Sequence, residues 1–415
     1  NIMDWSLEKI YKEQVSGNVP QRRHLRVLGE ENTEQEKRFV AYTRDKIKEL
    51  IDNLDIDDAD PEQLAALYKR IHNFTAYRPL KGAVVSKGYH PDIIKKYSRE
   101  IQNLIEPLDP EETKIFIDYI KNPQKQHEFP REARGNLYRA LKETGIPESV
   151  IKGIVTHTTQ DEKKLGVGMG EVALALIFKD IENTKEGKGD LSIRVGDNAF
   201  ESFEIKGENA TLGPKPDDLI PASNKYLGKP NAPGEYFANF GLTHHESGKG
   251  YRLINDKNES WTYPKNVNFT EALSETFKQT DDKQGFKDEL KRLLVNLPKL
   301  DPGAVNYMME KIDFNNPDSI QTNIAVMNFI TYAKKHGFTH FLAHDHGSEQ
   351  FTKSGRRAAS SAPMQGDYIY VHGSPEQMAE QLLQNKVKFE KIKHNNLNPR
   401  IGFAGKFSDE EYEEF

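Results

Sequence analysis

The chain has no cysteine, no long apolar run and no net positive charge. Without cysteine it forms neither disulfides nor thiolate metal sites, which is compatible with a reducing compartment. No stretch approaches the roughly 18–20 apolar residues of a membrane helix. The net charge of -6 means that any contact with nucleic acid would depend on local basic patches. We therefore expect a cytoplasmic protein that does not enter a membrane.

The length of 415 residues predicts two domains of ordinary size. Apolar residues make up 36% and charged residues 29% of the chain, a balance typical of a globular protein with a substantial core. After residue 156 the helical periodicity gives way to a polar, glycine-rich segment. We place an all-helical N-terminal domain at residues 1–157. An α/β domain follows at 158–415, with an insertion at about 211–302.

Apolar residues at helical spacing and turn residues at the ends predict most of the elements. In the first domain we expect helices at 4–16, 33–54, 61–74, 90–108, 110–121, 131–144 and 147–156. In the second domain we expect helices at 171–178, 269–277, 284–296, 303–311, 319–336 and 374–383, and strands at 338–344 and 367–372. The glycines at 166–170 lack the lysine and the Ser/Thr of a phosphate-binding loop, so a flexible helix entry is the better interpretation.

The most informative stretch alternates apolar and polar residues. Period-two alternation predicts strands at 190–195 and 199–207. Residues 196–198, Gly-Asp-Asn, form a tight turn of the kind that closes a hairpin. The stretch is therefore predicted to be a β-hairpin.

The alternation also predicts which side chains share a face. Glu204 and Lys206 fall on one face, while Phe203 and Ile205 face the core. Asp190, at the start of the partner strand, reaches the same edge. Two carboxylates and a backbone carbonyl are the oxygen ligands that Mg²⁺ prefers. The hairpin therefore carries a candidate metal site.

At this point the residues resemble the PD-(D/E)xK nuclease superfamily, which has the restriction-endonuclease-like fold. The common core of that family is a helix with a Glu, strands with an Asp and a Glu-x-Lys, then a helix and further strands. The four places are matched in order by Glu171, Asp190, Glu204 and Lys206. Gly189 stands where the family motif has proline. The resemblance covers roughly residues 166–209, with weaker support from 318–383.

The resemblance implies a mixed sheet flanked by helices and the hydrolysis of phosphodiester bonds with Mg²⁺, for which Mn²⁺ substitutes. Asp190, Glu204 and the backbone carbonyl of Ile205 would hold the metal. Glu171 would act as a further ligand or through a bridging water. Lys206 would orient or deprotonate the attacking water and steady the charge of the phosphate. A bound metal lowers the pKa of water and stabilises the transition state.

The triplet itself is not specific. Acid-x-Lys also occurs at 112–114, 161–163, 186–188 and 281–283. Residues 204–206 are selected by context, because they lie in a period-two strand whose predicted partner begins with an aspartate. The alternative is an ordinary edge hairpin whose Glu and Lys are solvated.

Basic residues in loops and strands are candidate DNA contacts. In the insertion and in the later part of the chain these are Lys215, Lys225, Lys229, Lys353, Arg356, Arg357, Lys386 and Lys388. The alternative for each is a solvated or structural position. A second metal group at 344–346, His-Asp-His, is weighed against the end of a strand with satisfied polar side chains.

Together with the candidate metal site, the resemblance implies a Mg²⁺-dependent endonuclease that acts on double-stranded DNA in the cytoplasm of a bacterial or phage-infected cell. A homodimer would suit the cutting of both strands by symmetry. One alternative is a non-catalytic nucleic-acid-binding or phage structural protein that keeps the nuclease fold. Another is a metal-dependent hydrolase with a substrate other than DNA.

Overall fold

A computed structural model of the chain describes residues 61–89, 105, 108–151, 169–183, 189–197, 199–207, 228–229, 232–233, 243–247, 250–254, 257–258, 260–264, 269–297, 299–344, 367–385, 387–389 and 401–403. The chain divides into two units, Asn1–Thr75 and Ala76–Phe415. Of the first unit, residues 61–75 are described. The predicted helices at 4–16 and 33–54, nearly all of the one at 90–108, residues 152–156 of the one at 147–156, and the domain boundary expected near residue 157 lie outside the described residues.

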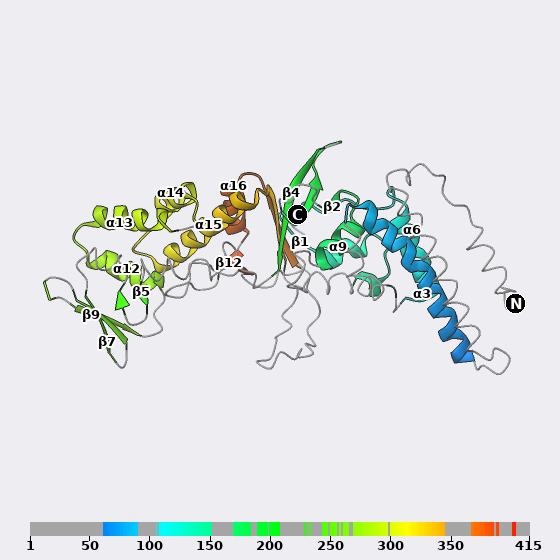
Figure 1. Cartoon of the computed structure of the whole chain (residues 1–415), viewed down its shortest axis with the longest axis horizontal. Coiled ribbons are helices and arrows are strands. Elements are labelled where there is room, and N and C mark those ends of the chain that lie inside the picture. Colours follow the sequence, from blue (N-terminus) through cyan, green and yellow to red (C-terminus); the bar gives the residue numbers. More distant parts are fainter. Residues whose placement is uncertain are drawn as a thin grey trace, which may run out of the picture. The chain divides into compact units, whose positions relative to one another are not determined.

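The described elements are labelled in Figure 1. The helices are α3 (Pro61–Ser86), α6 (Pro110–Lys121), α7 (Leu137–Lys142), α9 (Met169–Ile177), α12 (Phe269–Gln279), α13 (Lys283–Val295), α14 (Pro302–Lys311), α15 (Pro317–His336) and α16 (Pro375–Gln384). The strands are β1 (Arg134–Asn136), β2 (Ile181–Asn183), β3 (Leu191–Arg194), β4 (Phe200–Gly207), β5 (Gly228–Lys229), β6 (Ala232–Pro233), β7 (Thr243–Ser247), β8 (Gly250–Ile254), β9 (Ser260–Pro264), β10 (His340–His344), β11 (Asp367–His372), β12 (Val387–Phe389) and β13 (Ile401–Phe403).

A mixed sheet of six strands organises the second unit, in the order β1-β11-β10-β4-β3-β2. β10 and β4 are parallel, and the other neighbours are antiparallel. The parallel pair requires a crossover, which here contains the predicted insertion and the helices α12–α15. The prediction of an α/β protein with a mixed sheet flanked by helices is confirmed at this level.

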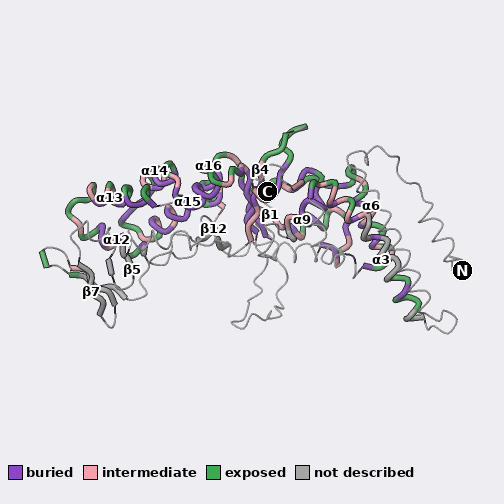
Figure 2. The backbone as a smooth tube through the Cα atoms, viewed as in Figure 1, coloured by how far each residue is buried: buried purple, intermediate pink, exposed green. Residues whose placement is uncertain are grey.

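Helix α15 is central to the core of the described residues. It packs against α12, α14 and α16, and its buried residues join those of β10 and β11 in one hydrophobic cluster. Figure 2 shows the buried segments running through this helix and the sheet strands. Its ends follow from the sequence. The Asn316 side chain accepts from backbone N–H groups of the first turn, and Gly337 ends the helix with a φ of 65°.

The predicted helix at 131–144 was wrong in its first part. Residues Arg134–Asn136 form β1, paired with β11, and only α7 is helical. Gly135 explains why this segment fits the sheet, since a Cβ there would lie 2.3 Å from the Tyr368 hydroxyl. The Asn136 side chain then caps α7 by accepting from the Arg139 N–H. A segment from the predicted helical domain is therefore a strand of the sheet.

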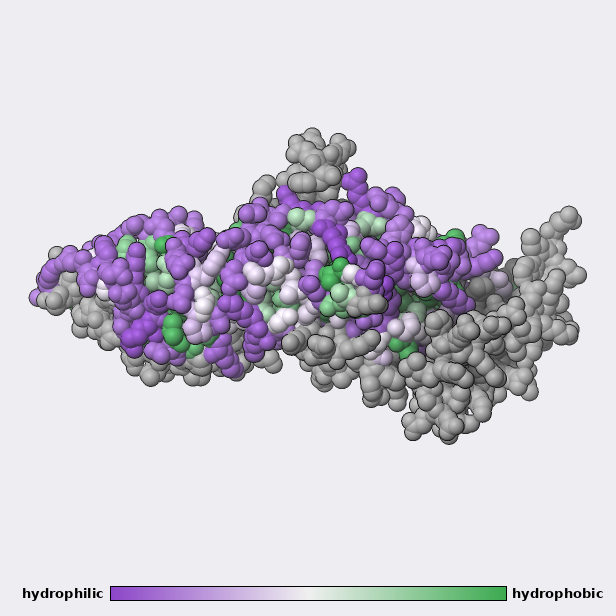
Figure 3. All heavy atoms as spheres, turned by 90° about the horizontal axis from the view of Figure 1, so that it is seen from above, coloured by the Kyte–Doolittle hydropathy of each residue, from purple (hydrophilic) through white to green (hydrophobic). Residues whose placement is uncertain are grey.

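The other predicted helices and strands within the described residues are present, with shifts of a few residues at their ends. The helix expected at 61–74 is longer, since α3 continues to Ser86. Among the described residues, no helix combines the length and the apolar character that crossing a bilayer requires. On the face shown in Figure 3, hydrophilic residues cover most of the described surface and hydrophobic ones form small separate patches.

Candidate functional site

Strands β3 and β4 bring Asp190, Glu204 and Lys206 together. The Lys206 ammonium lies 2.5 Å from Glu204 Oε1 and 3.2 Å from Asp190 Oδ2. The Ile205 N–H donates to the same Asp190 oxygen at 3.1 Å. The alternation that placed Glu204 and Lys206 on one face therefore also places the Asp190 carboxylate beside them. Both carboxylates are aimed at one positive charge.

The face that carries Glu204 is covered by α15. Tyr332 donates a hydrogen bond to Glu204 Oε1, and the Lys206 ammonium lies 5.8 Å from the centre of the Tyr332 ring. The Glu204 side chain is only 2% exposed, whereas that of Asp190 is 19% exposed. The sequence placed Phe203 toward the core, and the face of Glu204 is buried as well, because a helix from the far side of the insertion packs on it.

The opposite face of β4 is covered by aromatic side chains. Phe203 is fully buried, with its ring centre 5.5 Å from that of Phe129 and 6.1 Å from that of Tyr370. Ring pairs at these separations stabilise a core beyond the apolar area that they bury. β4 is thus held from both sides, and its polar residues have a fixed position.

Burial and charge act together on the ionisation of this cluster. Burial raises the pKa of Glu204 above its usual value, opposed by the Lys206 ammonium, while the Asp190 charge adds to the increase. Burial disfavours the charged form of Lys206, but Glu204 and Asp190 outweigh it and hold the Lys206 pKa well above its usual value. Burial therefore accounts for the raised pKa of Glu204, and the two carboxylates beside one ammonium account for the raised pKa of Lys206.

Gly189 gives a physical reason for the departure from the family motif. Its backbone φ is +70°, and a Cβ there would lie 2.3 Å from Ser202 Oγ. The proline ring fixes φ near −65°, so proline does not fit this backbone. The chain therefore reaches Asp190 through a turn that requires glycine.

The donor set fits a divalent cation in chemistry, with two carboxylates and a backbone carbonyl. The shared Lys206 ammonium shows that Asp190 and Glu204 reach a common positive charge. Within the described residues, no three His, Asp or Glu side chains gather closely enough to hold a metal ion. Glu171 lies in the first turn of α9 and is half-buried. Its part in a metal site stays a prediction.

Most of the predicted DNA contacts cannot be placed. Lys215, Lys225, Lys353, Arg356, Arg357 and Lys386 lie outside the described residues. Lys229 lies in β5 and Lys388 in β12. His344 ends β10 as a buried residue, and residues 345–346 lie outside the described part of the chain.

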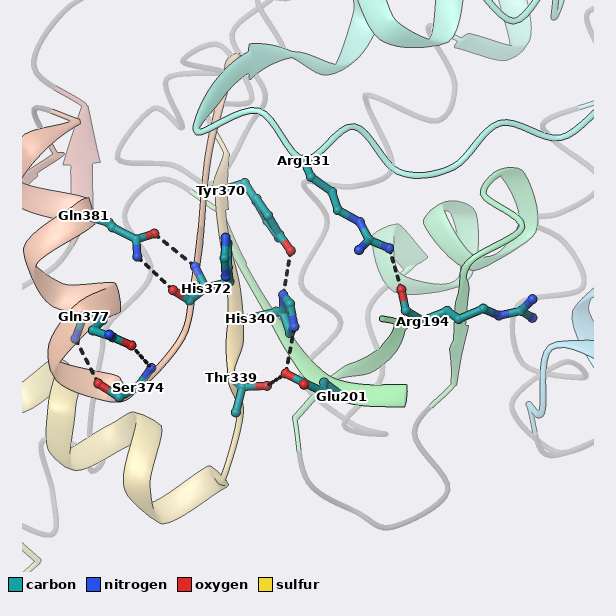
Figure 4. Close-up of polar contacts among 10 residues, drawn as sticks. All are labelled: Arg131, Arg194, Glu201, Thr339, His340, Tyr370, His372, Ser374, Gln377 and Gln381. Carbon is teal, nitrogen blue, oxygen red and sulfur yellow. Dashed lines mark hydrogen bonds and ion pairs between the residues drawn. The ribbon is translucent and has the colours of Figure 1, made fainter. Parts of the chain in front are cut away.

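A second polar cluster lies on the Phe203 face, across β4, β10 and β11 (Figure 4). Glu201 Oε2 accepts from the Thr339 hydroxyl at 2.7 Å and lies 3.0 Å from His340 Nε2. The other ring nitrogen of His340 lies 2.6 Å from the Tyr370 hydroxyl. The His372 ring stacks on His340 with 5.7 Å between centres. Sequence reasoning missed this cluster, because its members come from three strands and follow no spacing motif.

His340 predicts a pH dependence of stability. Burial lowers its pKa, as do the neighbouring charges of His372 and Arg131, while Glu201 opposes the decrease. A neutral His340 is satisfied, accepting from Tyr370 at one nitrogen and donating to Glu201 at the other. Below about pH 6.5 His340 binds a proton in the unfolded chain but not in the folded chain, so the free energy of unfolding falls. The loss is complete once the pH is below the folded pKa.

Between pH 7 and pH 5.5 we expect the free energy of unfolding of the wild type to fall by about 1 kcal/mol more than that of His340→Gln. Urea unfolding at several pH values measures this difference. The matched control is His127→Gln, because His127 is exposed and should leave the wild-type slope unchanged. Glu201 also has a lowered pKa, because of the Thr339 hydrogen bond, but it acts below this window. Equal slopes in wild type and His340→Gln would contradict the assignment.

No family model, curated protein or solved structure matches this chain. The sheet topology alone defines the class of the protein, a mixed-sheet α/β protein.

Proposed function

We propose that the chain is a Mg²⁺-dependent endonuclease that hydrolyses phosphodiester bonds in DNA. The observation that supports this is the convergence of Asp190 and Glu204, from adjacent strands, on the Lys206 ammonium at 3.2 and 2.5 Å. Their order along the chain matches that of the PD-(D/E)xK nucleases. A pair of carboxylates next to a lysine provides both a cation site and a positive charge for a phosphate.

Each residue has a role in this proposal. Asp190 and Glu204, with the Ile205 carbonyl, hold the Mg²⁺, and Glu171 supports them directly or through water. The bound ion supplies an acidified water and a Lewis acid at the phosphate. Glu204 and Asp190 hold the pKa of Lys206 well above its usual value, so it keeps its proton. Of the two roles that the resemblance implies, its ammonium therefore takes the first: it orients the attacking water and steadies the charge that develops on the phosphate.

Tyr332 extends the site by one residue. Its hydroxyl donates to Glu204 Oε1 and its ring lies beside the Lys206 ammonium. We assign it a positioning role, because it fixes the orientation of the Glu204 carboxylate without carrying a charge of its own. Its pKa is raised by burial and by Glu204, so the hydroxyl keeps its proton for this hydrogen bond.

One observation favours the rival function, a non-catalytic nucleic-acid-binding or phage structural protein. Glu204 is almost fully buried and is contacted by both Tyr332 and Lys206. A buried, mutually satisfied ion pair also occurs as a purely structural element. The two functions therefore differ in whether these carboxylates take up a metal ion.

Incubation of the purified chain with a supercoiled plasmid separates the two functions. The test is run with Mg²⁺, with Mn²⁺ and with EDTA, and in parallel on linear single-stranded DNA and on RNA. We expect conversion of the plasmid to open-circular and linear forms with either metal and none with EDTA. A closed circle has no ends, so its cleavage identifies an endonuclease. Binding of these substrates without cleavage under any metal condition would favour the non-catalytic rival.

A further inference from the structure

The β3–β4 hairpin carries a row of side chains that starts at Asp190, Glu204 and Lys206. Ser192 is paired with Ser202 one step along the ribbon. Residues two apart on a strand share a face of the sheet, so Ser192 lies on the face of Asp190, and Ser202 on that of Glu204. A polar row therefore continues from the candidate site along one face of the hairpin, with Ser192 buried and Ser202 half-buried.

The row ends at Arg194 and Phe200, which are paired with each other at the end of the hairpin. The guanidinium carbon of Arg194 lies 5.3 Å from the centre of the Phe200 ring. Phe200 is 39% exposed, whereas Phe203 on the same strand is fully buried. Packing of the core therefore does not explain an aromatic residue at position 200.

The charge of Arg194 is turned outward. In Figure 4 its guanidinium points away from Arg131, whose side chain instead donates to the Arg194 backbone oxygen. Within the described part of the chain, no carboxylate forms an ion pair with this guanidinium. An exposed aromatic ring beside a guanidinium without an anionic partner is suited to a ligand that has both flat rings and negative charges.

We propose that this face of the β3–β4 hairpin binds an unpaired segment of nucleic acid and leads it toward Asp190, Glu204 and Lys206. A nucleobase stacks on Phe200, and Arg194 contacts the adjacent phosphate. The segment is unpaired, because a ring can stack on Phe200 only if the face of the base is free. Phe200 and Glu204 are four positions apart on β4, about 13 Å. Glu204 and Ser192 are buried, so a bound strand reaches that end of the hairpin at Asp190 and Lys206, which are partly exposed.

We call the row of side chains from Phe200 and Arg194 to Asp190 the strip. That a bound strand runs along it toward the candidate site rests on the proposed nuclease function, but the stacking of a base on Phe200 does not. Binding is therefore measured without cleavage, in EDTA, by the fluorescence anisotropy of a labelled single-stranded DNA 15-mer and of a blunt duplex. We expect Phe200→Ala and Arg194→Ala each to weaken single-strand binding, Phe200→Ala by roughly 5- to 100-fold. Binding of the blunt duplex should change by less than about twofold for Phe200→Ala, because its bases are already paired.

Two controls match these variants. Ile115 is an exposed apolar residue of α6, at 51% exposure, and Arg292 is an exposed arginine of α13 that pairs with Glu289. Ile115→Ala and Arg292→Ala should leave single-strand binding unchanged. A 2-aminopurine base in the 15-mer should be quenched on binding to wild type and much less on binding to Phe200→Ala, which reports stacking directly.

The outcomes separate this inference from the proposed function. A wild type that does not cleave, but whose single-strand binding depends on Phe200, supports the strip and contradicts the nuclease. A wild type that cleaves, while Phe200→Ala binds single strands as Ile115→Ala does, overturns the strip alone. Absence of single-strand binding by the wild type also overturns it.

Discussion

The Lys206→Met variant is expected to be less stable than the wild type by about 3–5 kcal/mol at neutral pH. Methionine keeps the length and the apolar stem of the side chain but lacks the ammonium. The Glu204 carboxylate, 2.5 Å from that ammonium and 2% exposed, then remains buried with the Asp190 carboxylate close by. Removing one partner of a buried pair leaves an uncompensated charge, and that charge determines the size of the loss.

The double variant Lys206→Met/Glu204→Gln is the control for this cause. Glutamine keeps an oxygen that accepts the Tyr332 hydrogen bond and carries no charge, so the double variant should regain much of the lost stability. The deficit of Lys206→Met should also shrink as the pH falls from neutral, because burial and Asp190 raise the pKa of Glu204 further once the ammonium is gone, and a neutral Glu204 no longer needs it. Urea unfolding followed by circular dichroism measures both effects. A Lys206→Met variant within about 1 kcal/mol of wild type would contradict the contacts around Lys206.

The sequence predicted the elements that depend on local patterns. The hairpin, α15 and α16 follow from periodicity and from caps such as Asn316, so they could be located without a structure. The shared face of Glu204 and Lys206 also follows from period two, and only the context of the triplet was needed to choose it. Asp190 is placed beside them because the two strands are consecutive and joined by a short turn.

The features that the sequence did not predict depend on contacts between distant residues. Tyr332 covers Glu204 from a helix 128 positions further along the chain. β1 pairs with β11, so the short segment around Gly135 is a strand only because Tyr368 lies across from it. A three-residue strand has too few residues to show a period, and no local pattern reports what packs against it. The restriction-endonuclease-like fold itself stays a proposal, resting on the order of four residues.

Asp190→Asn is expected to reduce cleavage at least about 1,000-fold, which corresponds to about 4 kcal/mol of transition-state stabilisation, while leaving the fold intact. Asparagine has nearly the same shape, and its oxygen can still accept from the Ile205 N–H, as Asp190 Oδ2 does. Lys206 keeps its contact with Glu204. What is lost is one of the two negative charges that would hold the metal ion. A substitution at Asp190 therefore tests catalysis without the large loss of stability expected for a substitution at Lys206.

The matched control for this variant is Asp281→Asn. Asp281 begins another acid-x-Lys triplet, and its carboxylate pairs with Lys257 at the surface. The Asp281→Asn variant should cleave plasmid like the wild type. Urea unfolding of Asp190→Asn should show a change below about 1 kcal/mol, since neither of its hydrogen-bonded neighbours is left buried without a partner. If a folded Asp190→Asn variant cleaves plasmid as fast as the wild type, this carboxylate is not part of the metal site. If Asp281→Asn loses cleavage as well, the effect is not specific to the hairpin.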